Sequence, residues 1–361
     1  MVRELRIGKQ FIGDNHPCFI TYEAGPTLSN LSTALSLVEE AAKSGADAIK
    51  FQIFNPDKLV EDKKQLFTYS ILVNRETGEL KEVSEPLYDI LVRRCLSTKE
   101  WEIVKKKADS LNLAFFATIG YEEDLELLKS MKCDSVKIAS SDVNHFPLLR
   151  LAAKSGMNVQ LDTGNSDINE IKEAVAVLEK EGCKSIIIHQ CPSGYPAKLP
   201  SICLRMIKTL KENFPKYPIA YSDHTPEADM DIAAVSLGAN LVEKTITLNR
   251  MTPSVEHVFS LEPKDMRIFI ERIRNLEIAL GSYNREITEK QKDDRKLLRR
   301  SPYITQDVSK GEYISNINVQ FRRPGVGMSP IEWEKLNRSN ARIKSSLYEG
   351  NILKVDMFDL N

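Results

Sequence analysis

Eight short apolar runs, separated by segments of helical pattern, limit the fold of this chain more than any other feature of its sequence. Each run is rich in β-branched or aromatic residues, which is typical of strands buried on both faces of a parallel sheet. The intervals, such as residues 31–45 and 168–182, carry apolar residues at i, i+3, i+4 and i+7. The runs span residues 19–25, 48–54, 113–119, 135–140, 158–164, 185–191, 218–224 and 241–247.

The helical segments also end in a repeated way. Gly45, Gly156 and Gly238 each follow the last expected helical turn before a strand, where glycine commonly terminates a helix. Eight such units over about 240 residues predict a TIM (β/α)8 barrel. An open doubly wound sheet is disfavoured because no G-x-G-x-x-G follows the first strand.

Three further segments interrupt or follow the repeat. Residues 55–97 are far longer than an ordinary connection and follow the second strand, so they are either a substrate wall or lid at the catalytic face, or a plain surface excursion. Residues 285–300 are almost entirely charged or polar, which favours a solvated linker. We therefore expect a barrel over residues 1–284, this linker, and a small β-rich domain over residues 301–361.

Composition excludes several classes of function. The 50 Lys and Arg residues balance 51 Asp and Glu residues, so the net charge of -1 gives no general attraction to nucleic acid or to an anionic membrane. No stretch approaches the roughly 18 apolar residues needed to span a bilayer, and the opening residues lack an apolar signal region. We expect a soluble cytoplasmic protein whose six scattered cysteines are mostly buried free thiols.

Two lysines, Lys50 and Lys137, stand within otherwise apolar strands. Burying an ammonium group is costly unless an anion accompanies it. A structural ion pair is one explanation, and the carboxylates available for it are Glu23, Asp142, Asp162 and Glu243. Because both lysines stand near Ser and Thr hydroxyls at the catalytic end of the predicted barrel, a pocket for a small anion carrying phosphate and carboxylate is the better account.

A metal site is a second prediction from the strand ends. His224 follows the seventh strand, and Glu256 and His257 follow the eighth. Imidazole with carboxylate suits a divalent Mn, Zn or Fe ion. A histidine with a purely structural role remains the alternative for His224.

Several segments resemble the N-acetylneuraminate (sialic acid) synthases and their legionaminic, pseudaminic and spore-coat polysaccharide relatives. Residues 322–330, RRPGVGMSP, resemble the core of the antifreeze-like (SAF) domain that ends those enzymes. The resemblance covers nearly the whole chain and implies a TIM barrel followed by a small β-rich SAF domain. The other matching segments are EAG (23–25), SGADAIKFQIF (44–54), VKIASSD (136–142), QCPSGYP (190–196), YSDHT (221–225) and SLEP (260–263).

The resemblance implies condensation of phosphoenolpyruvate (PEP) with a sugar aldehyde of N-acylhexosamine type, giving a 2-keto sugar acid and phosphate. It implies a catalytic group of Glu23, Asp142, Lys50 and Lys137. PEP would be held by Lys50, Thr118, Lys137, Ser140, Ser193 and Ser222. The sugar would contact Gln52, Tyr195, Glu256 and Arg323.

The same resemblance implies a divalent metal bound through His224, with Mn²⁺ as the leading ion and Mg²⁺ or Co²⁺ as others. The metal would polarise the aldehyde for attack by C3 of PEP, and a carboxylate such as Glu23 or Asp142 would assist the addition of water at C2. Phosphate would then leave by C–O cleavage. Arg323 would reach the barrel of a second subunit, so a domain-swapped homodimer is expected.

The chain departs from the family pattern around the site. Residues 26–30 read PTLSN instead of the usual N-H-N-G, and Thr245 stands at the second metal-binding histidine, which makes His257 or Glu256 the nearest replacement. The other departures are Asp142 for Glu, Asp162 for Ser and Glu256 for Asp. Two rival functions stay open: an aldolase that forms a Schiff base on Lys50 or Lys137, and a non-catalytic sugar-binding homologue.

Overall fold

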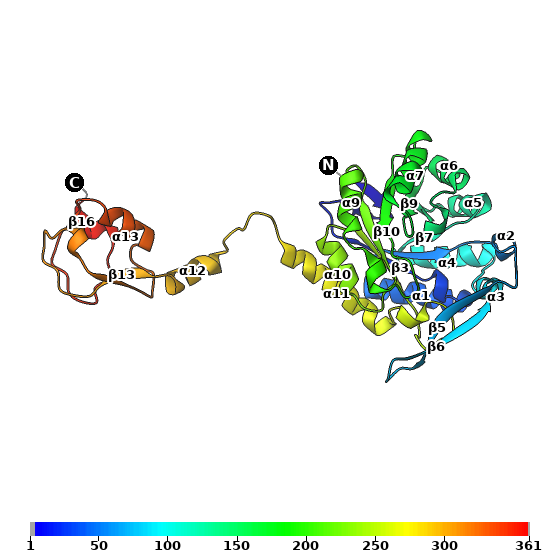
Figure 1. Cartoon of the computed structure of the whole chain (residues 1–361), viewed down its shortest axis with the longest axis horizontal. Coiled ribbons are helices and arrows are strands. Elements are labelled where there is room, and N and C mark those ends of the chain that lie inside the picture. The colour runs from blue at the N-terminus through cyan, green and yellow to red at the C-terminus, as the bar shows by residue number, and fades with distance from the viewer. Residues whose placement is uncertain (1–3, 360–361) are drawn as a thin grey trace. The chain divides into compact units, whose positions relative to one another are not determined.

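The computed structural model describes residues 4–359 and divides the chain into two compact units, Met1–Gly281 and Ser282–Asn361. A closed barrel of eight parallel strands forms the centre of the first unit (Figure 1). Each strand lies within one of the eight predicted runs, so the predicted barrel is confirmed. The strands are β3 (Phe19–Glu23), β4 (Ala48–Gln52), β7 (Ala114–Thr118), β8 (Ser135–Ile138), β9 (Asn158–Asp162), β10 (Ile186–Gln190), β11 (Ile219–Asp223) and β12 (Leu241–Thr245).

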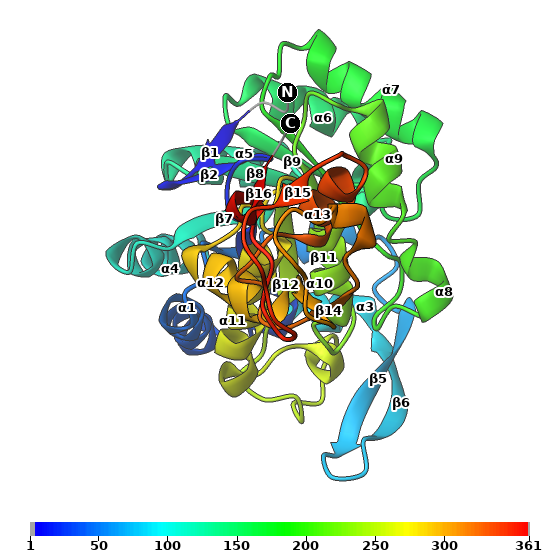
Figure 2. The same ribbon diagram turned by 90° about the vertical axis from the view of Figure 1, so that its left-hand side faces the viewer.

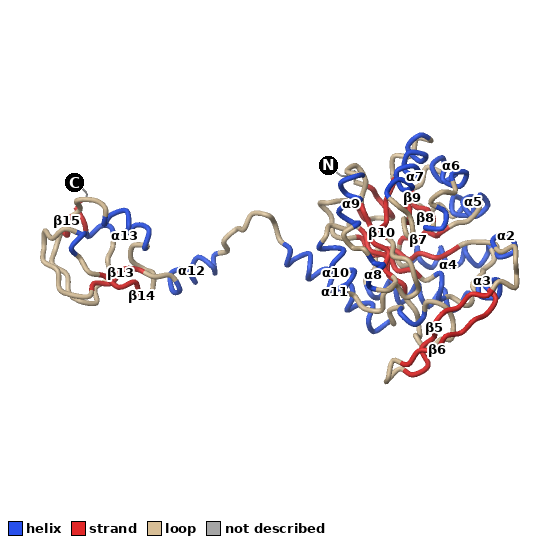
Figure 3. The backbone as a smooth tube through the Cα atoms, in the orientation of Figure 1, coloured by secondary structure: helices blue, strands red, loops and turns tan. Residues whose placement is uncertain are grey.

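Helices surround the barrel and cover the outward faces of its strands (Figure 3). Their ends follow local rules: the Asn30 side chain accepts a hydrogen bond from the Thr33 N–H at the start of the first helix, and Gly45 ends that helix with φ 91°. The helices are α1 (Leu31–Ser44), α4 (Thr98–Ser110), α5 (Glu122–Ser130), α6 (Phe146–Lys154), α7 (Ile168–Lys180), α8 (Leu199–Ile202), α9 (Met206–Asn213), α10 (Asp229–Ser236) and α11 (Pro263–Leu280).

Side chains alternate between the helices and the barrel interior along every strand, as the two-residue period requires. On β4, Ile49 and Phe51 pack outward in the main core, whereas Ala48 packs inward. A hairpin of β1 (Leu5–Ile7) and β2 (Gln10–Ile12) packs against the inward residues at the N-terminal ends of the strands. That end of the barrel is therefore filled with apolar side chains.

The long insertion after β4 folds as α2 (Pro56–Leu59), a hairpin of β5 (Leu66–Asn74) and β6 (Glu79–Pro86), and α3 (Leu87–Val92). In Figure 2 the hairpin extends beyond the helices of the barrel. Arg75 anchors it to the loop after β12 through two hydrogen bonds to Glu262, of 2.5 and 2.7 Å. The insertion is thus fixed at the C-terminal end of the barrel.

The second unit has its own apolar core around Ile304, Ile314 and Leu353. The structure differs from the predicted linker, because residues 289–298 form a helix capped by Thr288, and the Gly325 N–H donates to the Lys296 carbonyl over 2.7 Å. No helix within residues 4–359 has the length and apolar content needed to cross a membrane. The elements are α12 (Glu289–Leu298), β13 (Ser301–Ile304), β14 (Val319–Arg322), α13 (Pro330–Asn337), β15 (Arg342–Ile343) and β16 (Phe358–Asp359).

Candidate active site

The inward positions of the barrel change from apolar to polar toward the C-terminal ends of its strands. Thr21 and Glu23 follow Phe19 on β3, and the other strands change in the same way. The C-terminal half of the barrel interior is therefore where charged groups meet, as expected for a TIM barrel. The further inward pairs are Ala48 and Lys50, Phe116 and Thr118, Ile187 and His189, Ala220 and Ser222, and Leu241 and Glu243.

Glu243 on β12 joins the two strand lysines. Its Oε1 lies 2.7 Å from Lys50 Nζ and its Oε2 lies 2.6 Å from Lys137 Nζ, and all three side chains are buried. Burial alone would raise the pKa of the Glu243 carboxyl, but the charges of Lys137 and Lys50 outweigh it and lower that pKa. Glu243 is therefore ionised at neutral pH and fixes the spacing of the two ammonium groups.

Each lysine has a second carboxylate partner. Lys50 pairs with Glu23, and Lys137 lies 3.0 Å from Asp162 Oδ2. Burial would lower the pKa of Lys50, but Glu23 and Glu243 raise it well above its usual value. Three of the four carboxylates named as partners in the sequence are thus bound to a lysine, whereas Asp142 instead lies 3.6 Å from His145.

Gly25 shapes the end of β3. Its N–H donates to Glu23 Oε1 over 2.6 Å, and a β-carbon at this position would lie 2.7 Å from the Gln52 backbone nitrogen. Any larger residue would push the backbone away from β4. The glycine of the E-A-G segment therefore permits the close approach that holds the Glu23 carboxylate.

A polar chain beneath the lysines was missed in the sequence. Ser222 Oγ lies 2.9 Å from Lys137 Nζ, 2.9 Å from Asp162 Oδ1 and 3.0 Å from His189 Nδ1. The other ring nitrogen of His189 lies 3.0 Å from Gln160 Oε1. Burial, followed by the charge of Lys137, lowers the pKa of His189 to about 3, so the ring is neutral. The sequence does contain a signal for His189 and Gln160: both occupy strand positions whose side chains alternate toward the barrel interior.

A cavity of about 480 Å³ opens above this cluster at the C-terminal end of the barrel. That volume suits a small-molecule site. Lys137 and Ser222 lie beneath the lining, where Glu243 and Asp162 separate them from the cavity. The predicted residues that line the cavity are Glu23, Lys50, Gln52, Thr118, Ser140, Asp142, Tyr195, His224 and Glu256.

The insertion supplies one wall of the cavity. Phe67 and Tyr69 from the hairpin, and Ile90 and Leu91 from α3, line it with apolar surface. Tyr69 and Ile90 also pack against Val255 on the opposite loop. Of the two interpretations of residues 55–97, the substrate wall agrees with this arrangement.

Two predicted site residues lie away from the cavity. Ser193 is exposed and does not line it, although its carbonyl accepts a hydrogen bond from Ser201. His257 is buried 2.7 Å from Thr247 Oγ1, because Glu256 has a left-handed φ of 64° that turns the chain between the two side chains. The sequence pattern could not reveal that turn.

Two other charged residues do not line the cavity. Lys244, a third lysine in the barrel strands, points outward from β12 and pairs with Asp223 and Asp231 against α10. Arg323 is exposed in the second unit. The structure therefore leaves the predicted role of Arg323 at a sugar as a hypothesis.

The residues present do not make a complete metal site. His224 lines the cavity, and its Nδ1 donates to the Pro192 carbonyl over 3.0 Å, which leaves Nε2 available as a ligand. Burial lowers the pKa of His224, which favours the neutral ring that binds metals. Within residues 4–359, however, no three His, Cys, Asp or Glu side chains are grouped as metal ligands.

Three comparisons with known proteins agree with this architecture. A model of the NeuB family matches residues 37–285. An uncharacterized protein of Methanocaldococcus jannaschii is 34% identical, over 98% of both chains. The N,N'-diacetyllegionaminic acid synthase of Legionella pneumophila is 30% identical, over 94% of both. The N-acetylneuraminic acid synthetase from Leptospira borgpetersenii, solved with citrate, superposes with a TM-score of 0.70 at 30% identity, over 81% of this chain and 95% of that one.

The raised pKa of Glu256 can be tested through the pH dependence of the protein's stability. Burial, followed by the negative charge of Glu23, raises the pKa of Glu256 from 4.5 to about 8. The folded protein then keeps a proton that the unfolded chain releases, so this site lowers stability as pH rises from about 4.5 through about 8. Glu256→Gln cannot ionise, so its melting temperature should exceed that of the wild type increasingly with pH, by about 3 °C for each kcal/mol.

Melting temperatures of both proteins between about pH 5 and pH 9 measure this effect. Glu262→Gln is the matched control, because hydrogen bonds from Arg75 lower the pKa of Glu262 to about 2. Its stabilising contribution is lost only as pH falls through that value, so its difference from the wild type should stay constant over the same range. A constant difference for Glu256→Gln as well would contradict the assignment.

Proposed function

Because the chain belongs to the NeuB family, we propose that it is a transferase that condenses PEP with the aldehyde of an open-chain sugar of N-acylhexosamine type. The products are a 2-keto sugar acid and phosphate. Relatives named as synthases of N,N'-diacetyllegionaminic acid and N-acetylneuraminic acid support this class of reaction. The observation that carries the proposal is a pair of buried lysines joined by Glu243: Lys50 lines the cavity and Lys137 lies just beneath its lining. We call this pair the lysine floor.

PEP binds in this proposal at the lysine floor. Its phosphate and carboxylate need two fixed cations and nearby hydroxyl donors, and Thr118 and Ser140 line the cavity beside Lys50. Because Glu23, Asp162 and Glu243 already neutralise the lysines, the bound anion competes with these carboxylates. Lys137 makes direct contact only after Glu243 or Asp162 moves aside.

Bond formation then proceeds between the two bound substrates. C3 of PEP attacks the aldehyde carbon, the aldehyde oxygen takes up a proton to become a hydroxyl, and positive charge develops at C2 of PEP. Water adds at C2 and loses one proton to a carboxylate. The C2 hydroxyl so formed gives its proton to the departing phosphate as the bond between C2 and the phosphate oxygen breaks, which leaves a ketone. Glu23 and Asp142 line the cavity as candidate bases, and burial raises the pKa of each.

The sugar occupies the part of the cavity beside the insertion. Gln52, Tyr195 and Glu256 supply polar contacts there, and the apolar wall of Phe67 and Tyr69 suits an acyl substituent. Holding the sugar carbonyl against C3 of PEP supplies much of the rate by positioning.

The ion pairs argue against an aldolase that forms a Schiff base. An attacking amine must be neutral, but the raised pKa of Lys50 keeps that group protonated. Two carboxylates and Ser222 surround the Lys137 ammonium. Treatment with borohydride in the presence of pyruvate or sugar should therefore leave no stable adduct, whereas a trapped imine would support the aldolase.

Dependence on a divalent ion is expected from the family, with Mn²⁺ as the leading ion. We propose that this chain holds such an ion weakly, because His224 is a single ligand and cannot complete the coordination of the metal by itself. The register of β11 and β12, in which Asp223 pairs with Lys244, would continue to bring position 245 beside His224. Thr245 therefore occupies the natural place of a second ligand.

The second unit is proposed to be an antifreeze-like (SAF) domain that completes the barrel of a partner in a domain-swapped homodimer. Arg323 is the residue proposed to reach the sugar. A guanidinium can make paired hydrogen bonds to an acyl oxygen or to hydroxyls, which a lysine cannot reproduce.

The lysine floor gives the first test of function. Phosphate release from PEP, screened against N-acylated hexosamines and other aldoses, should identify a sugar that supports turnover. With that sugar, Lys50→Met and Lys137→Met should each lower the rate at least about a hundredfold, since each removes a fixed charge at the reacting anion. No release with any sugar would favour the non-catalytic homologue, whereas release that needs no sugar would show hydrolysis of PEP and contradict the proposed condensation.

Folding must be checked in these variants by circular dichroism, because removing one member of a buried ion pair costs about 3–5 kcal/mol. Lys211→Met is a matched control, since Lys211 pairs with Asp14 over 2.8 Å outside the cavity. It should keep nearly full activity. Near wild-type activity in a folded Lys50 or Lys137 variant would remove that lysine from the site.

Metal content tests the proposed weak site. Wild-type protein dialysed with Mn²⁺ should retain little metal, and His224→Ala should retain less, because the principal imidazole is gone. Thr245→His should bind Mn²⁺ at least about tenfold more tightly, since it adds a second imidazole. Tight stoichiometric binding by the wild type, or no gain in Thr245→His, would contradict the proposal.

Mixed dimers test the proposed exchange of domains. Arg323→Ala and Lys137→Met subunits should each be inactive alone. A mixture refolded together should regain up to about a quarter of wild-type activity per barrel, because random pairing makes half of the dimers mixed and each mixed dimer has one intact site. Mixed dimers without activity would show that Arg323 acts within its own chain or plays no part.

A further inference from the structure

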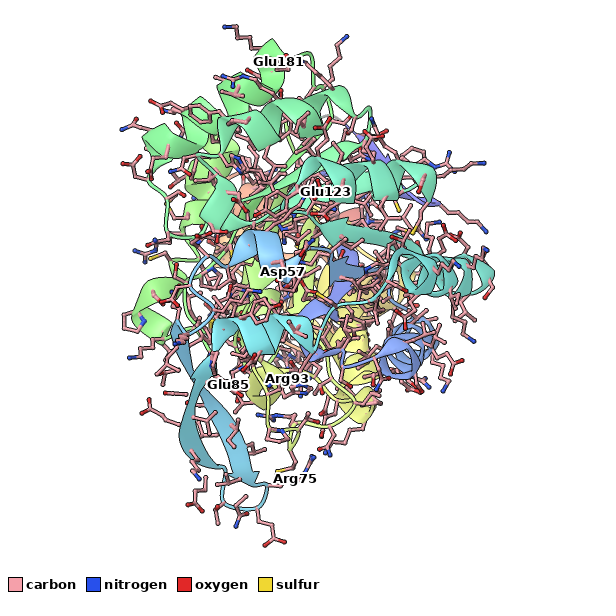
Figure 4. The ribbon with its side chains drawn as sticks, turned by 90° about the vertical axis from the view of Figure 1, so that its right-hand side faces the viewer. Asp57, Arg75, Glu85, Arg93, Glu123 and Glu181 are labelled. Atoms are coloured by element: carbon pink, nitrogen blue, oxygen red, sulfur yellow. The ribbon has the colours of Figure 1, made fainter. Side chains whose placement is uncertain are left out.

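Arg94 is a buried cation that neither the lysine floor nor the proposed reaction uses. It follows α3, lines the cavity and is 8% exposed. Within residues 4–359, no hydrogen bond or ion pair joins its guanidinium to another side chain, and its buried Nε has no acceptor. The adjacent Arg93 differs, since it is half-exposed and makes two hydrogen bonds to Glu85 (Figure 4).

An arginine in this position is costly to the unliganded protein. A guanidinium stays charged at physiological pH, and a buried charge without a direct partner costs several kcal/mol. The carboxylates that act on Arg94 through space are Glu256 and Glu23. Glu23 is engaged with Lys50 and the Gly25 N–H, and Glu256 acts on Arg94 through space without an ion pair. The guanidinium therefore keeps its donors free for something that enters the cavity.

The charges of the residues that line the cavity indicate what kind of ligand Arg94 would bind. Lys50 is neutralised by Glu23 and Glu243, whereas Arg94 has no such neighbour in contact. A planar guanidinium matches a phosphate or a carboxylate, to which it can donate two parallel hydrogen bonds. A neutral sugar hydroxyl would leave the buried charge uncompensated.

We infer that Arg94 binds an anionic oxygen group, a phosphate or a carboxylate, of a substrate in this cavity. The identity of the substrates rests on the proposed function, and the anionic group belongs either to PEP or to an acidic or phosphorylated sugar. Arg94 belongs to the wall formed by the insertion, just after α3, whereas the lysines belong to the barrel strands β4 and β8. The cavity thus has a second anion-binding point, supplied by a different element.

The test compares Arg94→Met and Arg94→Lys with the matched control Arg93→Met. Binding of PEP and of inorganic phosphate to each unliganded protein is measured by calorimetry, and the apparent KM for PEP and for the sugar is measured where turnover is found. Melting temperatures without ligand are recorded for all four proteins. Arg94→Met should melt at or above the wild-type temperature, because it removes an unpaired buried charge.

The two sources of the anion give different results. If it belongs to PEP, Arg94→Met should bind PEP at least about tenfold more weakly and Arg94→Lys should lie between it and the wild type. If it belongs to the sugar, PEP binding should persist, KM for the sugar should rise about tenfold, and wild-type protein should prefer phosphorylated or carboxylated sugars. Arg93→Met should bind both substrates normally.

The inference is overturned if Arg94→Met binds PEP and uses the sugar within about twofold of the wild type. A lower melting temperature alongside such unchanged binding would show that Arg94 serves the fold. The calorimetric measurement of binding does not require turnover. It can therefore test the role of Arg94 even if the proposed reaction does not take place. A protein that binds PEP through Arg94 but never releases phosphate would refute only the reaction.

Discussion

The bridge that Glu243 makes between Lys50 and Lys137 is the interaction on which the rest of the site depends. Two ammonium groups inside a barrel would repel one another and could not remain buried alone. One carboxylate, with an oxygen 2.7 Å from the first and 2.6 Å from the second, allows both to be present. Glu23 and Asp162 complete the balance from neighbouring strands, so these ion pairs join five strands of the barrel.

Because of this balance, a substrate anion would have to compete with the protein's own carboxylates for the two lysines. In the proposed binding of PEP, the phosphate would reach the lysines only by replacing carboxylates that already pair with them, so its affinity would be the difference between these two sets of ion pairs. Asp162 takes part in this balance, because its Oδ2 lies 3.0 Å from Lys137 Nζ and its Oδ1 accepts a hydrogen bond from Ser222.

Much of this arrangement could be predicted from residue order alone. The repeat of eight β/α units predicts the barrel. A lysine such as Lys50 in an apolar strand predicts a charged side chain in the barrel interior. His189 was overlooked because a single polar residue in an apolar run resembles a packing variation. Arg94 and Arg93 are neighbours of equal chemistry, and only the packing of the insertion decides which is buried. His257 was misplaced because the left-handed φ of Glu256 leaves no clear mark in the sequence.

The hairpin of β1 and β2 has a consequence for the order of events at the site. Ile7 and Ile12 fill the N-terminal end of the barrel. Small molecules can therefore enter and leave the barrel only at its C-terminal end, where the insertion lies. Lys50 belongs to a barrel strand, whereas Tyr69 and Ile90 belong to the insertion that follows that strand at the C-terminal end of the barrel. In the proposed reaction, a sugar seated against that wall would stand in the path to the lysines, so PEP would enter first and the sugar would follow. A single entrance to the cavity would thereby impose an ordered kinetic sequence on the two proposed substrates.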